Sequence, residues 1–256
     1  MGKIIAVANQ KGGVGKTTTA VNLSACLAYK GKKILLIDAD PQGNATSGLG
    51  IQKNNAQLST YDILISPEKT SEAVVKTKYS GLYVIISNNN LSGAEIELAP
   101  EDNREYFLKN ALTGISEDFD YIIIDSPPAL GMITLNILTA CDSVLIPIQC
   151  EYYALEGLTQ LNATLRAVKK KLNPDIEIEG ILATMFDGRT NLSAHVLEEI
   201  REYFPDKLYD TVIPRNVRLS EAPSFGEPVI KYDITSKGAE SYFSLAKEII
   251  RKQKQR

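Results

Sequence analysis

The stretch that decides the fold is residues 11–18, which read Lys11-Gly12-Gly13-Val14-Gly15-Lys16-Thr17-Thr18. It lies between a short apolar run at residues 4–8 and a helical pattern at residues 17–30. Its glycines let backbone N–H groups turn toward a bound anion and approach it closely. The helix that begins near Thr17 adds its dipole and its free N–H groups at the same place. A strand, a glycine-rich turn and a helix in this order predict a loop that binds phosphate groups.

Two side chains of this loop suit a nucleoside triphosphate with magnesium. Lys16 brings a positive charge to the β- and γ-phosphates, and the Thr17 hydroxyl is the kind of oxygen ligand that Mg²⁺ prefers. The usual pattern of such loops has glycine at the position of Gln10, and here Lys11 opens the loop instead. Two lysines around one triphosphate indicate that one of them serves the nucleotide of a second copy of the chain.

Acids follow two other apolar runs. Residues 34–37 lead into Asp38 and Asp40, and residues 121–124 lead into Asp125. Ligands of open α/β sheets bind at the carboxyl ends of the strands, so we expect these acids to converge on the phosphate loop. Asp125 fits the acid that holds the magnesium shell through water. Asp38 and Asp40 point the same way along an extended chain. The pattern leaves open which of them orients the metal shell, which orients the attacking water, and whether either is only a turn cap.

The wider pattern predicts the fold class. Short runs rich in Ile, Val and Leu, without alternation, are typical of strands buried on both faces of a parallel sheet. They occur at residues 4–8, 34–37, 84–86, 121–124, 144–148 and 178–183. Helices are expected at residues 17–30, 103–112, 132–140, 155–172, 193–203 and 238–251, and Gly31 stands where the first helix should stop. This alternation predicts a doubly wound α/β fold, with a mostly parallel sheet flanked by helices.

The remaining segments have a weaker secondary-structure pattern. Residues 43–71 have the weakest pattern, and we expect loops with a short helix there; residues 251–256 form a basic tail. No stretch resembles a linker between domains, so residues 1–256 are predicted to form a single domain.

Composition excludes several classes of protein. The 256 residues are 44% hydrophobic and 23% charged, which excludes a disordered chain or a disulfide scaffold. The net charge of −3 means that any binding of an anion depends on local clusters. Cys26, Cys141 and Cys150 lack metal-ligand spacing, which indicates a reduced cytoplasmic protein. The first apolar run breaks at Asn9, too early for a signal peptide. No segment reaches the roughly 20 apolar residues of a membrane span, and His195 is expected on a helix surface.

Four blocks of sequence together resemble one family. They are residues 9–23 (NQKGGVGKTTTAVNL), 35–50 (LLIDADPQGNATSGLG), 121–131 (YIIIDSPPALG) and 213–228 (IPRNVRLSEAPSFGEP). In these blocks, and over essentially its whole length, the chain resembles the ParA/Soj family of chromosome- and plasmid-partitioning ATPases. That family belongs to the deviant Walker A group of P-loop ATPases, together with MinD and the nitrogenase iron protein.

The resemblance implies roles for individual residues. Lys11 is similar to the signature lysine that reaches the partner's ATP in a sandwich dimer, and Gly12 lies where the two phosphate loops meet. Asp40 matches the acid that assists hydrolysis. Lys16, Thr17 and Asp125 match the nucleotide and magnesium residues, and Pro214 and Asn216 match contacts on the adenine side.

The family also implies partners and a location. Its members bind double-stranded DNA non-specifically as ATP dimers, and a ParB-like DNA-binding protein stimulates slow hydrolysis. On this chain the residues expected to contact DNA phosphates are Arg189, Arg215 and Arg218, with lysines or arginines of the last helix. A cytoplasmic, nucleoid-associated homodimer that uses ATP and Mg²⁺, without stable membrane association, is therefore expected.

Three alternatives stay open. A MinD-like membrane ATPase needs an exposed apolar face on the last helix. An electron-transfer ATPase needs paired cysteines that hold an iron–sulfur cluster near the dimer axis, and Cys141 and Cys150 do not have a convincing arrangement for this. A ParA relative that positions another cargo would use the same site, so the sequence separates it poorly.

Overall fold

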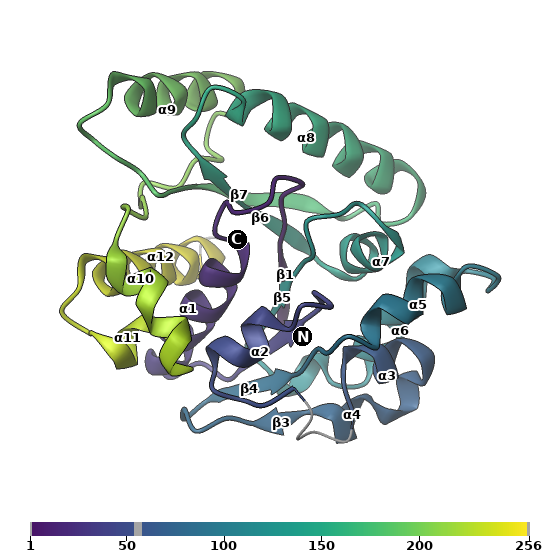
Figure 1. Ribbon diagram of the computed structural model, residues 1–256. Helices are drawn as coiled ribbons and strands as arrows, with labels where there is room; N and C mark the ends of the chain where they lie inside the picture. The colour runs from purple at the N-terminus through teal and green to yellow at the C-terminus, as the bar shows by residue number, and fades with distance from the viewer. Residues whose placement is uncertain (1, 54–57, 255–256) are drawn as a thin grey trace.

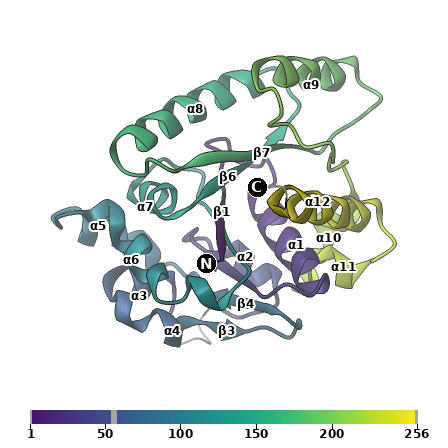
Figure 2. The ribbon, with the colours of Figure 1, turned by 180° about the vertical axis from the view of Figure 1, so that it is seen from behind.

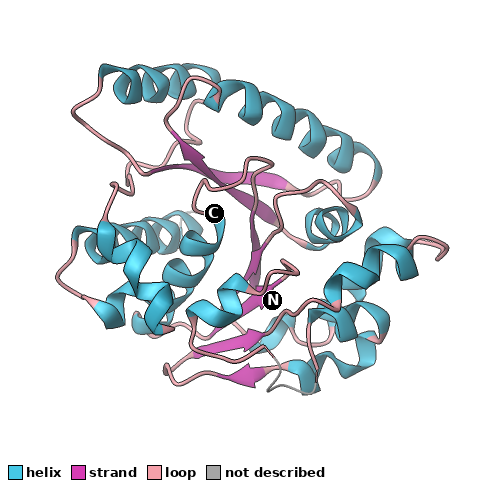
Figure 3. Cartoon of the chain, viewed as in Figure 1, coloured by secondary structure: helices cyan, strands magenta, loops and turns pink. Residues whose placement is uncertain are grey.

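The computed structural model describes residues 2–53 and 58–254. Over these residues seven strands form one sheet in the order β3-β4-β2-β5-β1-β6-β7 (Figures 1 and 3). Neighbouring strands are parallel except for β3 and β4, which are antiparallel. The strands are β1 (Lys3–Val7), β2 (Ile34–Asp38), β3 (Val75–Lys76), β4 (Leu82–Ile85), β5 (Tyr121–Asp125), β6 (Ser143–Gln149) and β7 (Glu177–Thr184). The predicted doubly wound, mostly parallel sheet is confirmed.

Every strand except β3 contributes to two hydrophobic cores, because successive side chains of a strand point to opposite faces of the sheet. In β5, Ile122 and Ile124 pack into one core and Ile123 into the other. All residues of β2 and β5 are buried, as the lack of alternation in their sequences predicted.

Helices cover both faces of the sheet. The helices on the face of Ile123 include α1 (Lys16–Tyr29), α11 (Val229–Tyr232) and α12 (Lys237–Lys254), and α1 and α12 lie side by side in both ribbon views (Figures 1 and 2). The opposite face is covered by α3 (Thr60–Ile65), α5 (Leu91–Leu98), α6 (Phe107–Thr113), α7 (Met132–Ala140), α8 (Ala154–Lys171) and α9 (Asn191–Tyr203). Gly31 has a φ of 81° directly after α1, as a helix stop requires.

Short elements depart from the sequence expectation. The weakly patterned segment holds α2 (Asn44–Gly48), α3, η1 (Pro67–Lys69) and the start of α4 (Thr70–Ala73), where one short helix was expected, and its residues 54–57 lie outside the described residues. The helix expected at 103–112 is divided into η2 (Arg104–Tyr106) and α6. β3, α5, α10 (Val217–Glu221), η4 (Ala222–Phe225) and α11 were not predicted, because elements this short hold too few residues to show a period. The remaining 3₁₀ turn is η3 (Ser116–Asp118).

The last helix packs against the body of the protein. Tyr242, Leu245, Ala246 and Ile249 of α12 are buried in the core that α1 shares. The basic tail expected at residues 251–256 is helical through Lys254, and residues 255–256 lie outside the described part of the chain. Within the described residues, no helix combines the length and apolarity needed to cross a bilayer.

The central strand provides a test of this packing. Ile123, in β5, is fully buried against the helices that cover its face of the sheet. Ile123→Ala should lower the free energy of unfolding by about 2–5 kcal/mol, because it leaves a cavity that the rigid sheet cannot close. Ile123→Val should cost about 0.5–1.5 kcal/mol. Chemical denaturation of both variants checks this, and equal losses would contradict the packing described.

Candidate nucleotide-binding site

Strand register brings the phosphate loop and the acids together. Asp125 is the register partner of Val7 on one side and of Asp38 on the other, so β1, β5 and β2 end at the same level. Neighbouring strands lie about 4.8 Å apart. The phosphate loop begins just after β1 ends, so it lies next to the acids at the ends of β2 and β5.

The loop itself is built on two left-handed glycines. Gly13 has a φ of 73° and Gly15, at the N-terminus of α1, a φ of 86°. An added Cβ at Gly13 would meet no atom within 4 Å, so backbone conformation rather than space requires glycine there. The Val14 carbonyl accepts a 2.8 Å hydrogen bond from Thr184 Oγ1, which ties the loop to the end of β7.

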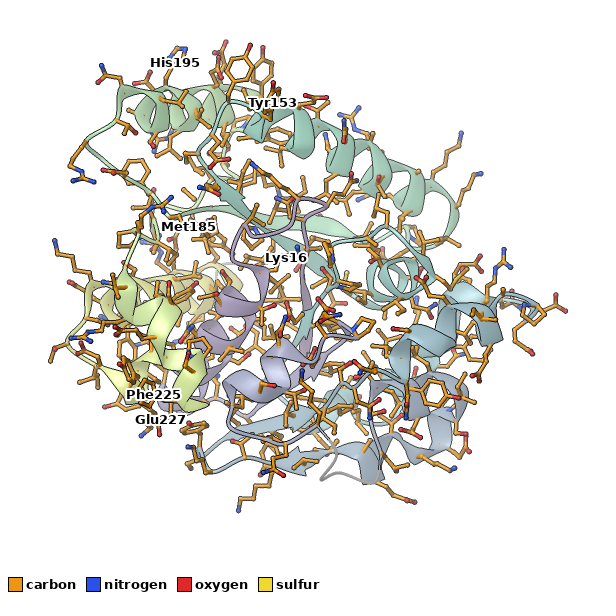
Figure 4. The ribbon with its side chains drawn as sticks, in the orientation of Figure 1. Lys16, Tyr153, Met185, His195, Phe225 and Glu227 are labelled. Carbon is orange, nitrogen blue, oxygen red and sulfur yellow. The ribbon has the colours of Figure 1, made fainter. Side chains whose placement is uncertain are left out.

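The Lys16 side chain is buried against the phosphate loop. Its Nζ donates to the Lys11 carbonyl at 3.1 Å, and only 7% of the residue is exposed. Burial lowers the pKa of Lys16, while the carboxylates of Asp125 and Asp40 oppose that shift. An ammonium group in this position is partly stripped of water and gains from a further anion. Figure 4 shows Lys16 near the centre of the molecule, where it lines the cavity at the phosphate loop.

The carboxylate of Asp125 is fully buried beside the Thr17 hydroxyl. Neither carboxylate oxygen has a donor of normal geometry within the described residues. Burial raises the pKa of Asp125 well above its ordinary value, and the neighbouring Asp38 carboxylate raises it further; Thr17 and Lys16 oppose the shift. Two oxygens that lack donors, next to a threonine hydroxyl, fit the environment of an oxygen-liganded cation.

Asp38 and Asp40 have different surroundings. Asp38 Oδ2 accepts two hydrogen bonds from Thr46, from its backbone N and its Oγ1, each at 2.7 Å. Burial raises the pKa of Asp38 to about 6, and the Thr46 bonds oppose the shift. Asp40 lines the cavity at the loop and Asp38 does not. The structure therefore places Asp40 for contact with a ligand, and it places Asp38 as the anchor of α2.

Lys11 points away from the phosphate loop. Its Nζ forms a 2.6 Å ion pair with Glu151, in the turn after β6, and both side chains are more than 40% exposed. Asn9 Nδ2 donates to the Pro147 carbonyl at 2.7 Å, so the start of the loop is tied to the same strand. In this single chain Lys11 does not line the cavity.

A cavity of about 530 Å³ extends from the phosphate loop to the segment at residues 213–223. Pro214 and Asn216 line its far wall, and the Asn216 side chain caps α10 by accepting from the Arg218 backbone N at 3.0 Å. The lining residues for which the sequence predicted no role include Asn44, Thr184 and Met185. Met185 has a φ of 49°. No sequence pattern predicts a positive φ at methionine, so its place on the cavity wall could not be predicted.

The three predicted DNA-contacting arginines do not form one cluster of free charges. Arg189 is largely exposed and its guanidinium bonds both oxygens of Asp187, at 2.8 and 2.6 Å. Arg215 lies on the nucleotide cavity and helps to lower the pKa of Asp187, after Arg189. Arg218 pairs with Glu221 at 2.8 Å and with Asp233 at 3.3 Å. Arg189 and Arg215 share a neighbour, whereas Arg218 has acids of its own.

The remaining candidates lie outside the cavity. Cys141 precedes β6 and Cys150 follows it, so they stand at opposite ends of a seven-residue strand, roughly 25 Å apart. Both are buried, so this pair cannot share a cluster. Cys26 is buried in α1, and burial raises its pKa to about 12. His195 lies on the outer surface of α9 (Figure 4), 3.8 Å from Glu199, as predicted.

A mostly parallel sheet with a glycine-rich loop after β1, a buried lysine and strand-end acids defines a P-loop nucleotide-binding protein. A family described as an AAA domain matches residues 2–178. The sporulation initiation inhibitor protein Soj of Bacillus subtilis is 61% identical over 249 residues, which are 97% of this chain and 98% of that protein. The chromosome partitioning protein ParA of Myxococcus xanthus is 54% identical over 252 residues, 98% of this chain and 89% of that protein. The chain therefore belongs to the ParA/Soj family of P-loop ATPases.

A solved structure agrees with this assignment. The cobyrinic acid a,c-diamide synthase from Mycobacterium smegmatis, solved with bound ADP and magnesium, superposes with a TM-score of 0.86. It is 37% identical, and the match covers 99% of this chain and 96% of that one.

The unpartnered Asp125 predicts a pH-dependent stability. Because its pKa is raised in the folded protein, the stability of the nucleotide-free protein should fall as pH rises through that pKa. Asp125→Asn removes the buried charge and should raise the free energy of unfolding by about 1–3 kcal/mol at pH 8, with a smaller gain near pH 5. Denaturation at both pH values checks this, with the exposed Asp102→Asn as control. A gain independent of pH would contradict the assignment.

Proposed function

We propose that this chain is an ATPase that binds ATP with Mg²⁺ in the cavity at residues 11–18, dimerises around two nucleotides, and binds double-stranded DNA non-specifically. In this proposal a ParB-like DNA-binding protein stimulates hydrolysis, and the cycle drives chromosome or plasmid segregation. One observation carries the proposal most directly: Lys16 and Asp125 are both buried and interact electrostatically beside the phosphate loop, and neither Asp125 oxygen has a donor of normal geometry within the described residues.

The residues present fit ATP with magnesium. Backbone N–H groups of Gly13–Gly15 and the Lys16 ammonium would hold the phosphates. The Thr17 hydroxyl and Asp125, acting directly or through water, would hold Mg²⁺, which when bound neutralises charge on the phosphates. Asp38 was predicted for this shell; its carboxylate already accepts bonds from Thr46 and the Asp40 backbone N, so its contribution is to position the loop. Pro214 and Asn216 line the end of the cavity where the base would lie.

Hydrolysis needs positioning more than covalent chemistry. Asp40 lines the cavity at the loop and is the acid placed to orient an attacking water. Lys11 would leave Glu151 and reach the nucleotide of the partner subunit; its exposed ion pair contributes at most about 1 kcal/mol, so little opposes that movement. The proposed ATPase is therefore switched on by its own dimerisation.

DNA binding is proposed for the face that carries Arg189, with Arg215 and Arg218 nearby in sequence and basic residues of α12. On α12, Lys252 lies 3.3 Å from Glu248 and over the Tyr209 ring, and Arg251 lies 3.9 Å from Asp210, so these charges are already partnered. Arg189 is the most exposed of the paired arginines and is the strongest candidate. A dimer joins two such patches, which makes binding dependent on ATP and on salt although the net charge is −3.

Localisation to the cytoplasm and nucleoid follows from the same proposal. A MinD-like membrane ATPase is disfavoured because the apolar residues of α12 pack against α1. Liposome flotation distinguishes the two: ATP-dependent binding to liposomes without DNA would favour the membrane alternative. A ParA relative that moves another cargo would use the same site, and a ParB-like protein that stimulates ATP turnover would argue against it.

Dimerisation can be tested without disturbing the subunit. An added Cβ at Gly12 meets no atom within 4 Å, so Gly12→Val should fold and bind ATP normally. Asp40→Ala should bind ATP but not hydrolyse it, and light scattering should show a stable dimer. Adding Gly12→Val to Asp40→Ala should return monomers, whereas Gly114→Val, an equally open position, should not. Monomeric Asp40→Ala with ATP would overturn the dimer.

DNA binding should depend on nucleotide. Duplex DNA titrated at two salt concentrations should bind tightly with ATP and weakly with ADP or no nucleotide. Arg189→Glu should preserve the ATP dimer and raise the dissociation constant by roughly tenfold or more for any sequence. The salt slope should fall by about two, since a dimer carries two copies. Arg104→Glu, in η2, which packs against α6 and α7, is the control, and unchanged DNA affinity in Arg189→Glu would reject its role.

A further inference from the structure

A buried hydroxyl connects the loop that carries Asp40 to two strands. Thr46, in α2, is fully buried, and its Oγ1 donates to Asp38 Oδ2 at 2.7 Å. The same Oγ1 accepts a 3.0 Å hydrogen bond from the backbone N of Ser87, just after β4. The hydroxyl therefore uses its single donor and an acceptor position at once, between the ends of β2 and β4.

The backbone around Asp40 is held by bonds that lead back to the Asp38 carboxylate. Asp38 Oδ1 accepts from the Asp40 backbone N at 3.3 Å, and Asp38 Oδ2 accepts from Thr46. Within the turn, Asp40 Oδ1 accepts from the Gln42 backbone N at 2.9 Å, and the Gly43 backbone N donates to the Asp40 carbonyl at 2.8 Å. The direction of Asp40 is thus set by one carboxylate and its partners.

Loss of the Thr46 hydroxyl would change this arrangement at a buried place. Asp38 Oδ2 would keep only the bond from the Thr46 backbone, and the Ser87 backbone N would lose its acceptor. Buried groups left without partners cost free energy, so the carboxylate and the turn would move to recover them. Thr46 does not line the cavity, so ATP itself would keep its contacts.

We propose that Thr46 is a positioning residue for ATP hydrolysis, whose hydroxyl holds the Asp38 carboxylate and thereby aims Asp40 at the cavity. The inference rests on the proposed ATPase function and on the role of Asp40 in it. A residue that contacts the nucleotide would affect both ATP turnover and ATP affinity. Thr46 should affect turnover alone, because turnover depends on the orientation of Asp40 and affinity depends on the phosphate loop.

The test compares a pair of variants with a neighbouring control. Thr46→Val keeps the shape and removes the hydroxyl, and Thr46→Ser keeps the hydroxyl and removes the methyl group. Thr60→Val is the control, since the buried Thr60 Oγ1 donates only to backbone carbonyls, Asp38 O at 2.6 Å and Ile86 O at 3.2 Å. ATP turnover at saturating ATP, ATP affinity by calorimetry, the ATP dimer by light scattering and thermal unfolding are measured for each.

Thr46→Val should lower turnover by roughly 10- to 100-fold, as displacement of a catalytic group by about 1 Å does. Its ATP affinity should stay within about threefold, and its ATP dimer should persist longer, because hydrolysis is the step that is slowed. Thr46→Ser should turn over ATP near the wild-type rate, and Thr60→Val should lose stability without losing turnover.

Three results would overturn the inference. They are wild-type turnover in Thr46→Val, equal losses in Thr46→Val and Thr46→Ser, or an equal loss of turnover in Thr60→Val. If Thr46→Val does not fold, a loss of turnover in folded Thr46→Ser would count against the inference, and wild-type turnover there would support it. Asp40→Ala separates this from the proposed function, because undiminished turnover in that variant would overturn both.

Discussion

The structure depends on the common level at which three parallel strands end. β2, β5 and β1 are neighbours, and their last positions, Asp38, Asp125 and Val7, are in register. This register puts two carboxylates next to each other in a fully buried place and puts the phosphate loop beside them. Burial of two neighbouring carboxylates raises the free energy of the folded protein, and the hydrogen bonds and the lysine near them reduce that cost.

The two acids are stabilised in different ways. Asp38 has its hydrogen bonds supplied by the chain itself, from Thr46 and from the Asp40 backbone N. Asp125 has no partner of normal geometry within the described residues, although Lys16 and Thr17 lie close enough to lower its pKa. One acid is therefore part of the scaffold, and the other is left for a ligand to complete. A buried carboxylate that stays unsatisfied beside a phosphate-binding loop is typical of a binding site.

Sequence reasoning located the phosphate loop and the strand-end acids, because each depends on a local pattern. Positive φ at Gly13 and Gly15 requires glycine, and continuous apolar runs mark strands buried on both faces. It did not locate Asn44 or Met185 on the cavity wall. It proposed Arg189 and Arg218 as DNA contacts without identifying the acids that pair with them in the folded chain. Such pairings depend on which loops meet in space, and no periodicity encodes them.

The sequence by itself determined the order of strands and helices, the loop that binds phosphate and the family to which the chain belongs. These follow from side-chain period, backbone preference and short motifs, which act over a few residues. Only the tertiary structure decided which acid faces the cavity, that Lys11 rests on Glu151, and that Thr46 joins the ends of β2 and β4. Those contacts join residues from separate segments of the chain, and their geometry is set by sheet register and core packing rather than by any local stretch.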